Sequence, residues 1–120
     1  LAKPTCAERL ALFFQIEADY LNKTRTYLGT YIRYLLRSGQ TEREQGDREV
    51  ENFVAFVLRE GQARGEINAD MNADAMAKHL VFMRSGTLIR WLEGTNDDLP
   101  AMLEEMLHLF LHGALQKTNS

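Results

Sequence analysis

Apolar side chains recur at steps of three and four residues along most of the chain, and this spacing predicts helices. The first helix is expected over residues 5–20, where Thr5 and Glu8 have the spacing of a capping box. Its apolar face consists of Cys6, Leu10, Phe13, Phe14, Ala18 and Leu21. No convincing alternating strand pattern is present, so an all-α fold is predicted.

A second helix is expected over residues 23–37, next to Tyr20. The four tyrosines of the chain form one narrow stripe on a helical wheel, beside a leucine and isoleucine stripe that faces the core. Packing at the core margin is the first interpretation of this stripe. The second is the wall of a ligand pocket, for which Tyr27 and Tyr31 are the candidates, and the third is contact with a partner. The basic face of this helix is expected to be solvated, and contact with a partner is the alternative. It carries Lys23, Arg25, Arg33 and Arg37.

Three more helices follow a polar loop at residues 40–47, and their expected ranges are 48–64, 73–92 and 99–115. Each has a residue suited to one of its ends: Gly65 after the third helix, Asn72 before the fourth, and Asp97 or Asp98 before the fifth. Pro100 lies near the start of the fifth helix, where proline is tolerated. Five helices are therefore expected in all.

The last two helices carry more apolar surface than one small core needs. In the fourth helix, Leu80 and Trp91 share one side, whereas Phe82 and Ile89 lie opposite. A helix that is apolar all round is buried on more than one side. This pattern predicts a homodimer in which two helices of each subunit form an antiparallel four-helix bundle. The expected interface residues are Phe82, Ile89, Leu92, Met102, Met106, Leu109 and Phe110.

Composition narrows the class of protein. With 120 residues, of which 45% are hydrophobic and 26% charged, the chain is expected to form one globular domain. Its net charge of −3 argues against nucleic-acid binding by this segment alone. The single cysteine excludes an internal disulfide and a multi-cysteine metal site. No apolar run is long enough to span a bilayer, and the start at Leu1 indicates a fragment of a longer protein.

The stretch VLREGQARGEINADMNADAMAKHLVFMRSGTLIRWLEG resembles the C-terminal regulatory domain of the TetR/AcrR family of bacterial transcription regulators. The resemblance rests on EGQARGEI closing one helix and ADAMAKHL opening the next. Gly86 in mid-helix, the pair Trp91 and Leu92, and a final helix ending in HGA also match. It covers roughly the C-terminal half, whereas the earlier helices match by order and length only.

The resemblance implies a division of the full protein into two parts. An N-terminal helix-turn-helix domain, absent from this chain, would bind operator DNA as a dimer. Residues 1–120 would be a single effector-binding and dimerisation domain, with its pocket among the first four helices and its dimer interface on the last two. A cytoplasmic location and no contact with a membrane are also implied.

Two charged residues are expected within apolar helix faces. Glu17 lies between Phe13 and Leu21 on the helical wheel, and Arg84 lies between Leu80 and Leu88. Because an unpaired buried charge is costly, each needs a partner or a route to water. Three interpretations stay open: both side chains reach solvent, they form a Glu17–Arg84 pair, or they line an effector pocket.

Other chemistry-bearing residues have simpler interpretations. Glu104, His108 and His112 share a helix face in a spacing that suits a metal, but a solvated face is expected for them. Cys6 is expected to be a small buried hydrophobe. No nucleophile or phosphate-binding motif is present, so neither an enzyme nor a cofactor is predicted.

These patterns together predict the ligand-sensing half of a TetR-like regulator, a repressor whose DNA affinity falls when a small, partly apolar effector binds. The expected ligand-binding residues are Phe13, Phe14, Glu17, Tyr27, Tyr31, Phe53, Val57, Leu80, Met83 and Arg84. The alternative is a helical homodimerisation or interaction module without a ligand, whose core would be filled.

Overall fold

The computed structural model describes residues 4–25, 41–94 and 98–113, with the side chains of 41–45 excepted. These residues form four helices, which are α1 (Cys6–Lys23), α3 (Thr41–Ala63), α4 (Ala73–Glu93) and α5 (Leu99–His112). No strand occurs in these ranges, so the prediction of an all-α fold is confirmed. The second expected helix, with Tyr27 and Tyr31, lies outside the described residues.

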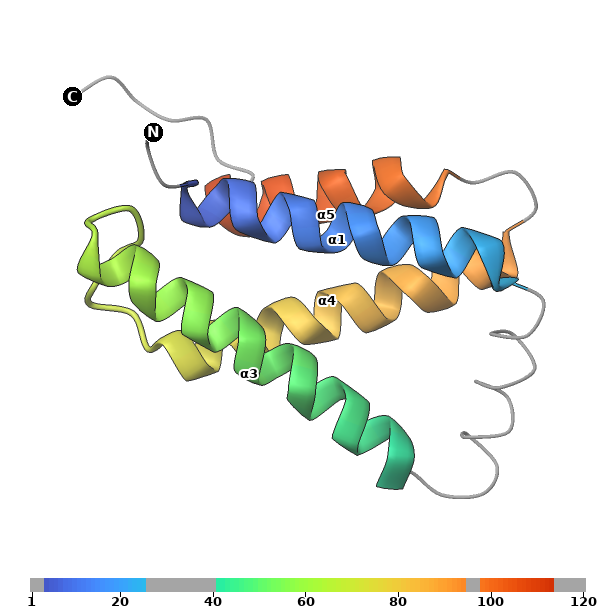
Figure 1. The fold of residues 1–120 in the computed structure, drawn as a ribbon, viewed down its shortest axis with the longest axis horizontal. Helices are drawn as coiled ribbons and strands as arrows, with labels where there is room; N and C mark the ends of the chain where they lie inside the picture. The colour runs from blue at the N-terminus through green and yellow to red at the C-terminus, as the bar shows by residue number, and fades with distance from the viewer. Residues whose placement is uncertain (1–3, 26–40, 95–97, 114–120) are drawn as a thin grey trace.

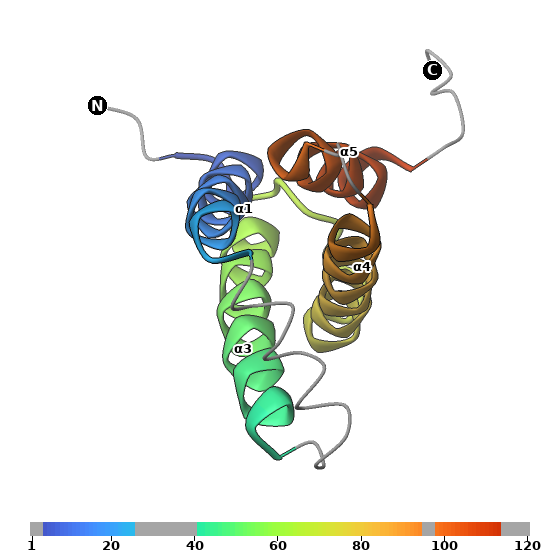
Figure 2. The same cartoon turned by 90° about the vertical axis from the view of Figure 1, so that its right-hand side faces the viewer.

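The four helices pack in a ring of neighbours. α1 packs on α5 and on α3, and α4 packs on α3 and on α5. α1 and α4 therefore lie across the bundle from each other (Figure 2). α1 and α3 come together where α1 begins and α3 ends, and they diverge toward the other end of the molecule (Figure 1). This arrangement leaves the outer sides of α4 and α5 facing away from α1 and α3.

The helix ends follow the local sequence. Thr5 caps α1, because its hydroxyl accepts a hydrogen bond from Glu8 N while the Glu8 carboxylate accepts one from Thr5 N. Asn72 and Asp98 cap α4 and α5 in the same way, by accepting hydrogen bonds from the backbone three residues on. After α3, Gly65 adopts a φ of 77°, which favours glycine. These four capping predictions are confirmed.

The hydrophobic core draws on every described helix. It contains Leu10 and Phe14 of α1, Val57 of α3, Trp91 of α4 and Leu103 of α5, all almost completely buried. One continuous cluster connects them, as expected for a single domain of this size. None of the described helices has a stretch long and apolar enough to cross a bilayer.

The α1 and α3 helices meet at a glycine. A Cβ atom added to Gly61 would lie 2.7 Å from Ile67 Cγ1 and 3.1 Å from Cys6 Cβ. The turn after α3 folds back here, since the backbone N–H groups of Glu66 and Ile67 both donate to Gly61 O. The Glu66 carboxylate in turn accepts a 2.6 Å hydrogen bond from Cys6 N at the start of α1. The side chain missing at Gly61 thus makes room for this junction.

One expected boundary was wrong. Residues 40–47 were expected to form a loop, but α3 already begins at Thr41. The segment TEREQGD is rich in glutamate, arginine and glutamine, which favour helix, yet it lacks the apolar residues that reveal a helix by periodicity. The helix is therefore extended at its polar start by about two turns.

Candidate functional site

Arg84 and Glu17 form a two-pronged ion pair inside the bundle. Arg84 Nε and Nη2 donate to the two carboxylate oxygens of Glu17, each at 2.7 Å. Both side chains are only 14% exposed. Of the three interpretations from the sequence, the structure thus contains the pair, and it does so in the geometry in which arginine binds a carboxylate most strongly.

The pair connects helices that otherwise have little contact. Glu17 lies on α1 and Arg84 on α4, which face each other across the bundle (Figure 2). A second carboxylate comes from α3, where Asp47 Oδ1 lies 3.7 Å from Arg84 Nη1. Arg84 of α4 therefore interacts with a carboxylate from α1 and with another from α3. Sequence reasoning missed Asp47, because it lies in the stretch expected to be a loop.

Among the other residues expected to bind a ligand, some are partly exposed and others are buried in the core. Phe13 and Phe53 are partly exposed and their rings touch, with centroids 4.9 Å apart. Met83 is partly buried against the core. The remaining described candidates are within the core, and these are Phe14, Val57 and Leu80. Tyr27 and Tyr31 lie outside the described residues.

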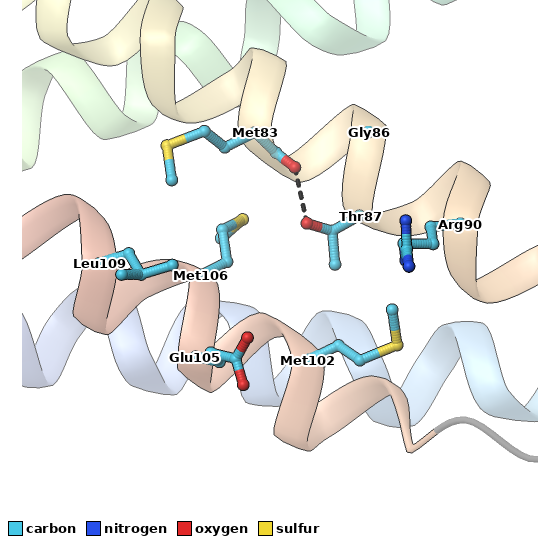
Figure 3. Close-up of a pocket in the computed structure, with 8 residues that line it drawn as sticks. All are labelled: Met83, Gly86, Thr87, Arg90, Met102, Glu105, Met106 and Leu109. Carbon is cyan, nitrogen blue, oxygen red and sulfur yellow. Dashed lines mark hydrogen bonds between the residues drawn. The ribbon is translucent and has the colours of Figure 1, made fainter. Parts of the chain in front are cut away.

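A groove of about 370 Å³ runs between α4 and α5 on the outer surface. It is lined by Met83, Gly86, Thr87, Arg90, Met102, Glu105, Met106 and Leu109 (Figure 3). Met83, Met106 and Leu109 lie toward one end, and Arg90 and Met102 toward the other (Figure 3). Of the described residues that were expected to bind a ligand, Met83 lines this groove. Three residues expected at the dimer interface also line it, and these are Met102, Met106 and Leu109.

The residues expected at the dimer interface differ in exposure. Phe82 is 78% exposed, Ile89 43% and Leu109 44%. Met106 is buried within the subunit. The others are partly buried against the core, and these are Leu92, Met102 and Phe110. The helices α4 and α5 thus keep large apolar side chains on their outer surface.

Arg25 makes a contact that the sequence did not predict. It was expected on a solvated basic face, but its Nη2 donates to Trp91 O at 2.9 Å and to Gly94 O, both at the end of α4. Its guanidinium carbon lies 4.7 Å from the centre of the Trp91 ring. Arg25 is therefore a cap for α4 that comes from the end of α1, and the expectation of solvation was wrong for this residue.

The apolar residues Leu12, Ile16 and Tyr20 form an exposed row on α1, at four-residue steps. Phe56 of α3 is exposed as well, and the Arg9 guanidinium lies 5.8 Å from its ring centre. The sequence analysis did not predict this exposed row. The signal that could have found it is the same four-residue spacing that identified the buried face of α1.

The remaining titratable residues show little sign of chemistry. The rings of His108 and His112 are 4.7 Å apart and tilted by 45°. Within the described ranges, no group of His, Cys, Asp or Glu has the arrangement of a metal site. Cys6 is buried, and burial, assisted by the charge of Glu66, raises the pKa of its thiol. At neutral pH this thiol stays protonated and weakly reactive.

No model of a known protein family matches this chain, and no curated protein or solved structure is significantly similar to it. The resemblance to TetR/AcrR regulators stays a prediction from the residues.

Proposed function

We propose that this chain is the effector-sensing and dimerisation domain of a TetR-like transcriptional repressor. The observation that supports the proposal best is that α4 carries large apolar side chains on two sides. This helix directs Arg84 inward to Glu17, whereas Phe82 and Ile89 on its other side are exposed. The inward side also buries Leu80, Leu88 and Trp91, so α4 is apolar on both sides, and a helix of this kind is suited to burial on more than one side.

The inward side suits ligand sensing. A few polar groups within an apolar cavity fix the orientation of a small ligand, and Arg84 with Glu17 would be such groups. A partly apolar effector with an oxygen acceptor would compete with Glu17 or Asp47 for the Arg84 guanidinium. Because Arg84 touches α1, α3 and α4 at once, such competition would change how these helices are held together.

The mechanism is a shift of populations. An effector that binds one arrangement of the helices better than the other favours that arrangement. In a dimer, the change would alter the spacing of the two attached helix-turn-helix domains and lower their affinity for operator DNA. The domain itself would have no catalytic activity, and the full regulator would act in the cytoplasm.

A thermal-shift screen against small aromatic and lipid-like compounds tests the sensing role. A ligand that binds only the folded state raises the melting temperature, by an amount that grows with its concentration. Arg84→Lys should reduce the shift caused by a hit, because lysine keeps the charge but loses the two-pronged geometry. Arg59→Lys is the matched control, since Arg59 also pairs with a carboxylate but at an exposed site.

The absence of any stabilising compound from such a screen would favour the alternative of a homodimerisation module without a ligand. An unchanged shift in Arg84→Lys would instead keep the sensing role and remove Arg84 from the binding site. These two results distinguish the function from the residue proposed to support it.

A further inference from the structure

The groove between α4 and α5 is formed by two matching stripes of side chains. Each helix contributes four residues at steps of three, one and three positions, so each stripe covers one helix face. The residues are Met83, Gly86, Thr87 and Arg90 on α4, and Met102, Glu105, Met106 and Leu109 on α5. Glu17 and Arg84 are not among them, so the groove is separate from the ion pair inside the bundle.

The two ends of the groove differ in their chemistry. Met83, Met106 and Leu109 make one end apolar, whereas Arg90 places a cation at the other end beside Met102 (Figure 3). Seven helical positions separate Met83 from Arg90, and at 1.5 Å per residue they span about 10 Å. The groove therefore has an apolar part and a cationic end over a length of about 10 Å.

The walls of the groove are suited to a small apolar ligand. Its volume of about 370 Å³ lies within the range of about 300–1,000 Å³ that is usual for small-molecule sites. Three of the five methionines of the chain line it, and methionine adapts to ligands of different shape. Gly86 and Thr87 contribute little bulk to its middle (Figure 3). The walls thus select for apolar character more than for one shape.

Two charged residues determine which polar group the groove favours. Arg90 and Glu105 both line it, and neither forms an ion pair within the described ranges. The Arg90 guanidinium is therefore available to an anionic oxygen, which arginine binds through charge-assisted hydrogen bonds. Glu105 repels an anion, and the repulsion is twice as large for a double negative charge as for a single one. A ligand with one negative charge close to Arg90 fits both residues best.

We propose that this groove binds a small amphiphilic carboxylate. The carboxylate lies at Arg90, and an apolar body of up to about 10 Å extends along the groove toward Met83, Met106 and Leu109. This is a second site, on the outer surface, in addition to the inner site proposed for the effector. It is formed by a single copy of the chain, so the inference requires neither sensing at Arg84 nor the proposed dimer.

Methyl NMR of the 120-residue chain locates the ligand. When the methionine methyl groups carry ¹³C, the protein gives five methyl signals, and each is assigned with a methionine-to-leucine variant. Octanoate is the probe. It should shift the signals of Met83, Met102 and Met106, which line the groove, and leave those of Met71 and Met76 unchanged.

A variant that fills the groove tests the site by its shape. Gly86→Leu should abolish the octanoate-induced shifts, because the leucine side chain occupies the middle of the groove. The same variant should not lower the melting temperature of the free protein, since leucine favours helix more than glycine does. Loss of binding would therefore not be a result of unfolding.

Two charge variants with opposite effects test the role of the carboxylate. Arg90→Gln should weaken octanoate binding about two- to fivefold, which is the range for an exposed ion pair. Glu105→Gln should strengthen it, because a repulsive charge is removed. Octanol has the same chain length without the charge, and it should bind equally to both variants and to the unsubstituted chain.

Lys78→Gln is the matched control for these variants. It removes one positive charge from an exposed position of the same helix, twelve positions before Arg90 and about 18 Å away along the axis. This distance exceeds the Debye length at physiological salt, so octanoate binding should not change.

The possible results separate this inference from the proposed function. Unchanged signals for the three groove methionines overturn the inference, and so does octanoate binding that neither Arg90→Gln nor Glu105→Gln alters. Binding that is lost in Arg84→Lys but kept in Arg90→Gln would assign the ligand to the inner site. That result would support the sensing role and contradict the inference. Groove shifts that persist in Arg84→Lys support the inference even if no compound acts at the inner site.

Discussion

Two glycines of the same helix show how differently one residue type is used. Gly61, near the end of α3, lies against Cys6 and Ile67, where a Cβ atom would overlap its neighbours. Gly46, near the start of α3, has open space around it, and a Cβ atom there would touch none of the described residues. The first glycine therefore serves the junction of α1 and α3, and the second only lowers the stability of the helix.

Alanine substitutions at these two positions should change stability in opposite directions. Gly61→Ala should lower the free energy of unfolding by about 1–3 kcal/mol, because the new methyl group overpacks the junction. Gly46→Ala should raise it by about 0.5–1 kcal/mol through helix propensity. Urea unfolding followed by circular dichroism measures both. Equal effects at the two sites would contradict the close contact at Gly61.

At the scale of the helices, the local sequence predicts some boundaries and misses others. The boundaries of α1, α4 and α5 were predicted to within a few residues, because their apolar faces and capping residues can be recognised from the local sequence. The start of α3 was missed, because its polar first turns carry no apolar stripe. Periodicity also placed Glu17 and Arg84 on buried faces. The Glu17–Arg84 pair was one of three interpretations, and the sequence did not decide among them, because the two residues are 67 positions apart and meet only through helix packing.

The contacts of Arg25 and Asp47 illustrate the same limit. Both residues lie in stretches that looked polar and solvated in the sequence. Arg25 caps the end of α4, and Asp47 approaches Arg84, only because neighbouring helices place those partners nearby. Long-range polar contacts of this kind have no signature in the local pattern.

The Glu17–Arg84 ion pair should stabilise the protein only while both partners are present. Glu17→Leu or Arg84→Met alone should each lower the free energy of unfolding by about 1–3 kcal/mol, because one largely buried charge loses its partner. The double variant Glu17→Leu with Arg84→Met should lose much less than the sum of the single variants, since both charges are gone. A double-mutant cycle in urea measures this coupling.

The exposed pair of Arg59 and Asp74 is the control for that cycle. It joins α3 to α4 at 2.8 Å but both side chains are more than half exposed. Its coupling energy should be below about 1 kcal/mol. Similar coupling energies for the two pairs would contradict the view that burial makes the Glu17–Arg84 link special.

At the scale of the whole molecule, apolar surface is distributed over two opposite sides. One side carries Phe82 and Ile89 on α4 with Leu109 on α5, and the other carries Leu12 and Ile16 on α1. Figure 2 shows α1 and α3 on one flank of the bundle and α4 with α5 on the other. The groove lies on the α4 and α5 side, on which the proposed dimer would form.

If this side is covered in a dimer, the thermal stability of the protein should depend on its concentration. A tenfold increase should raise the melting temperature, because mass action favours the folded dimer over unfolded monomers. Phe82→Ala should remove most of this dependence, whereas Ile16→Ala should preserve it. Differential scanning calorimetry over two decades of concentration provides the measurement. A concentration-independent melting temperature for the unsubstituted chain would contradict the dimer.

The packing of α1 on α5 has a consequence for how the chain folds during its synthesis. These are the first and last described helices, so the apolar side of α1 packs partly on a helix that is made after α3 and α4. On the ribosome, at about 5–20 residues per second, several seconds pass between the emergence of α1 and that of α5. Throughout this interval the apolar face of α1 lacks its final neighbour. During this interval, helper proteins that shield nascent apolar helices would therefore have a binding site on α1.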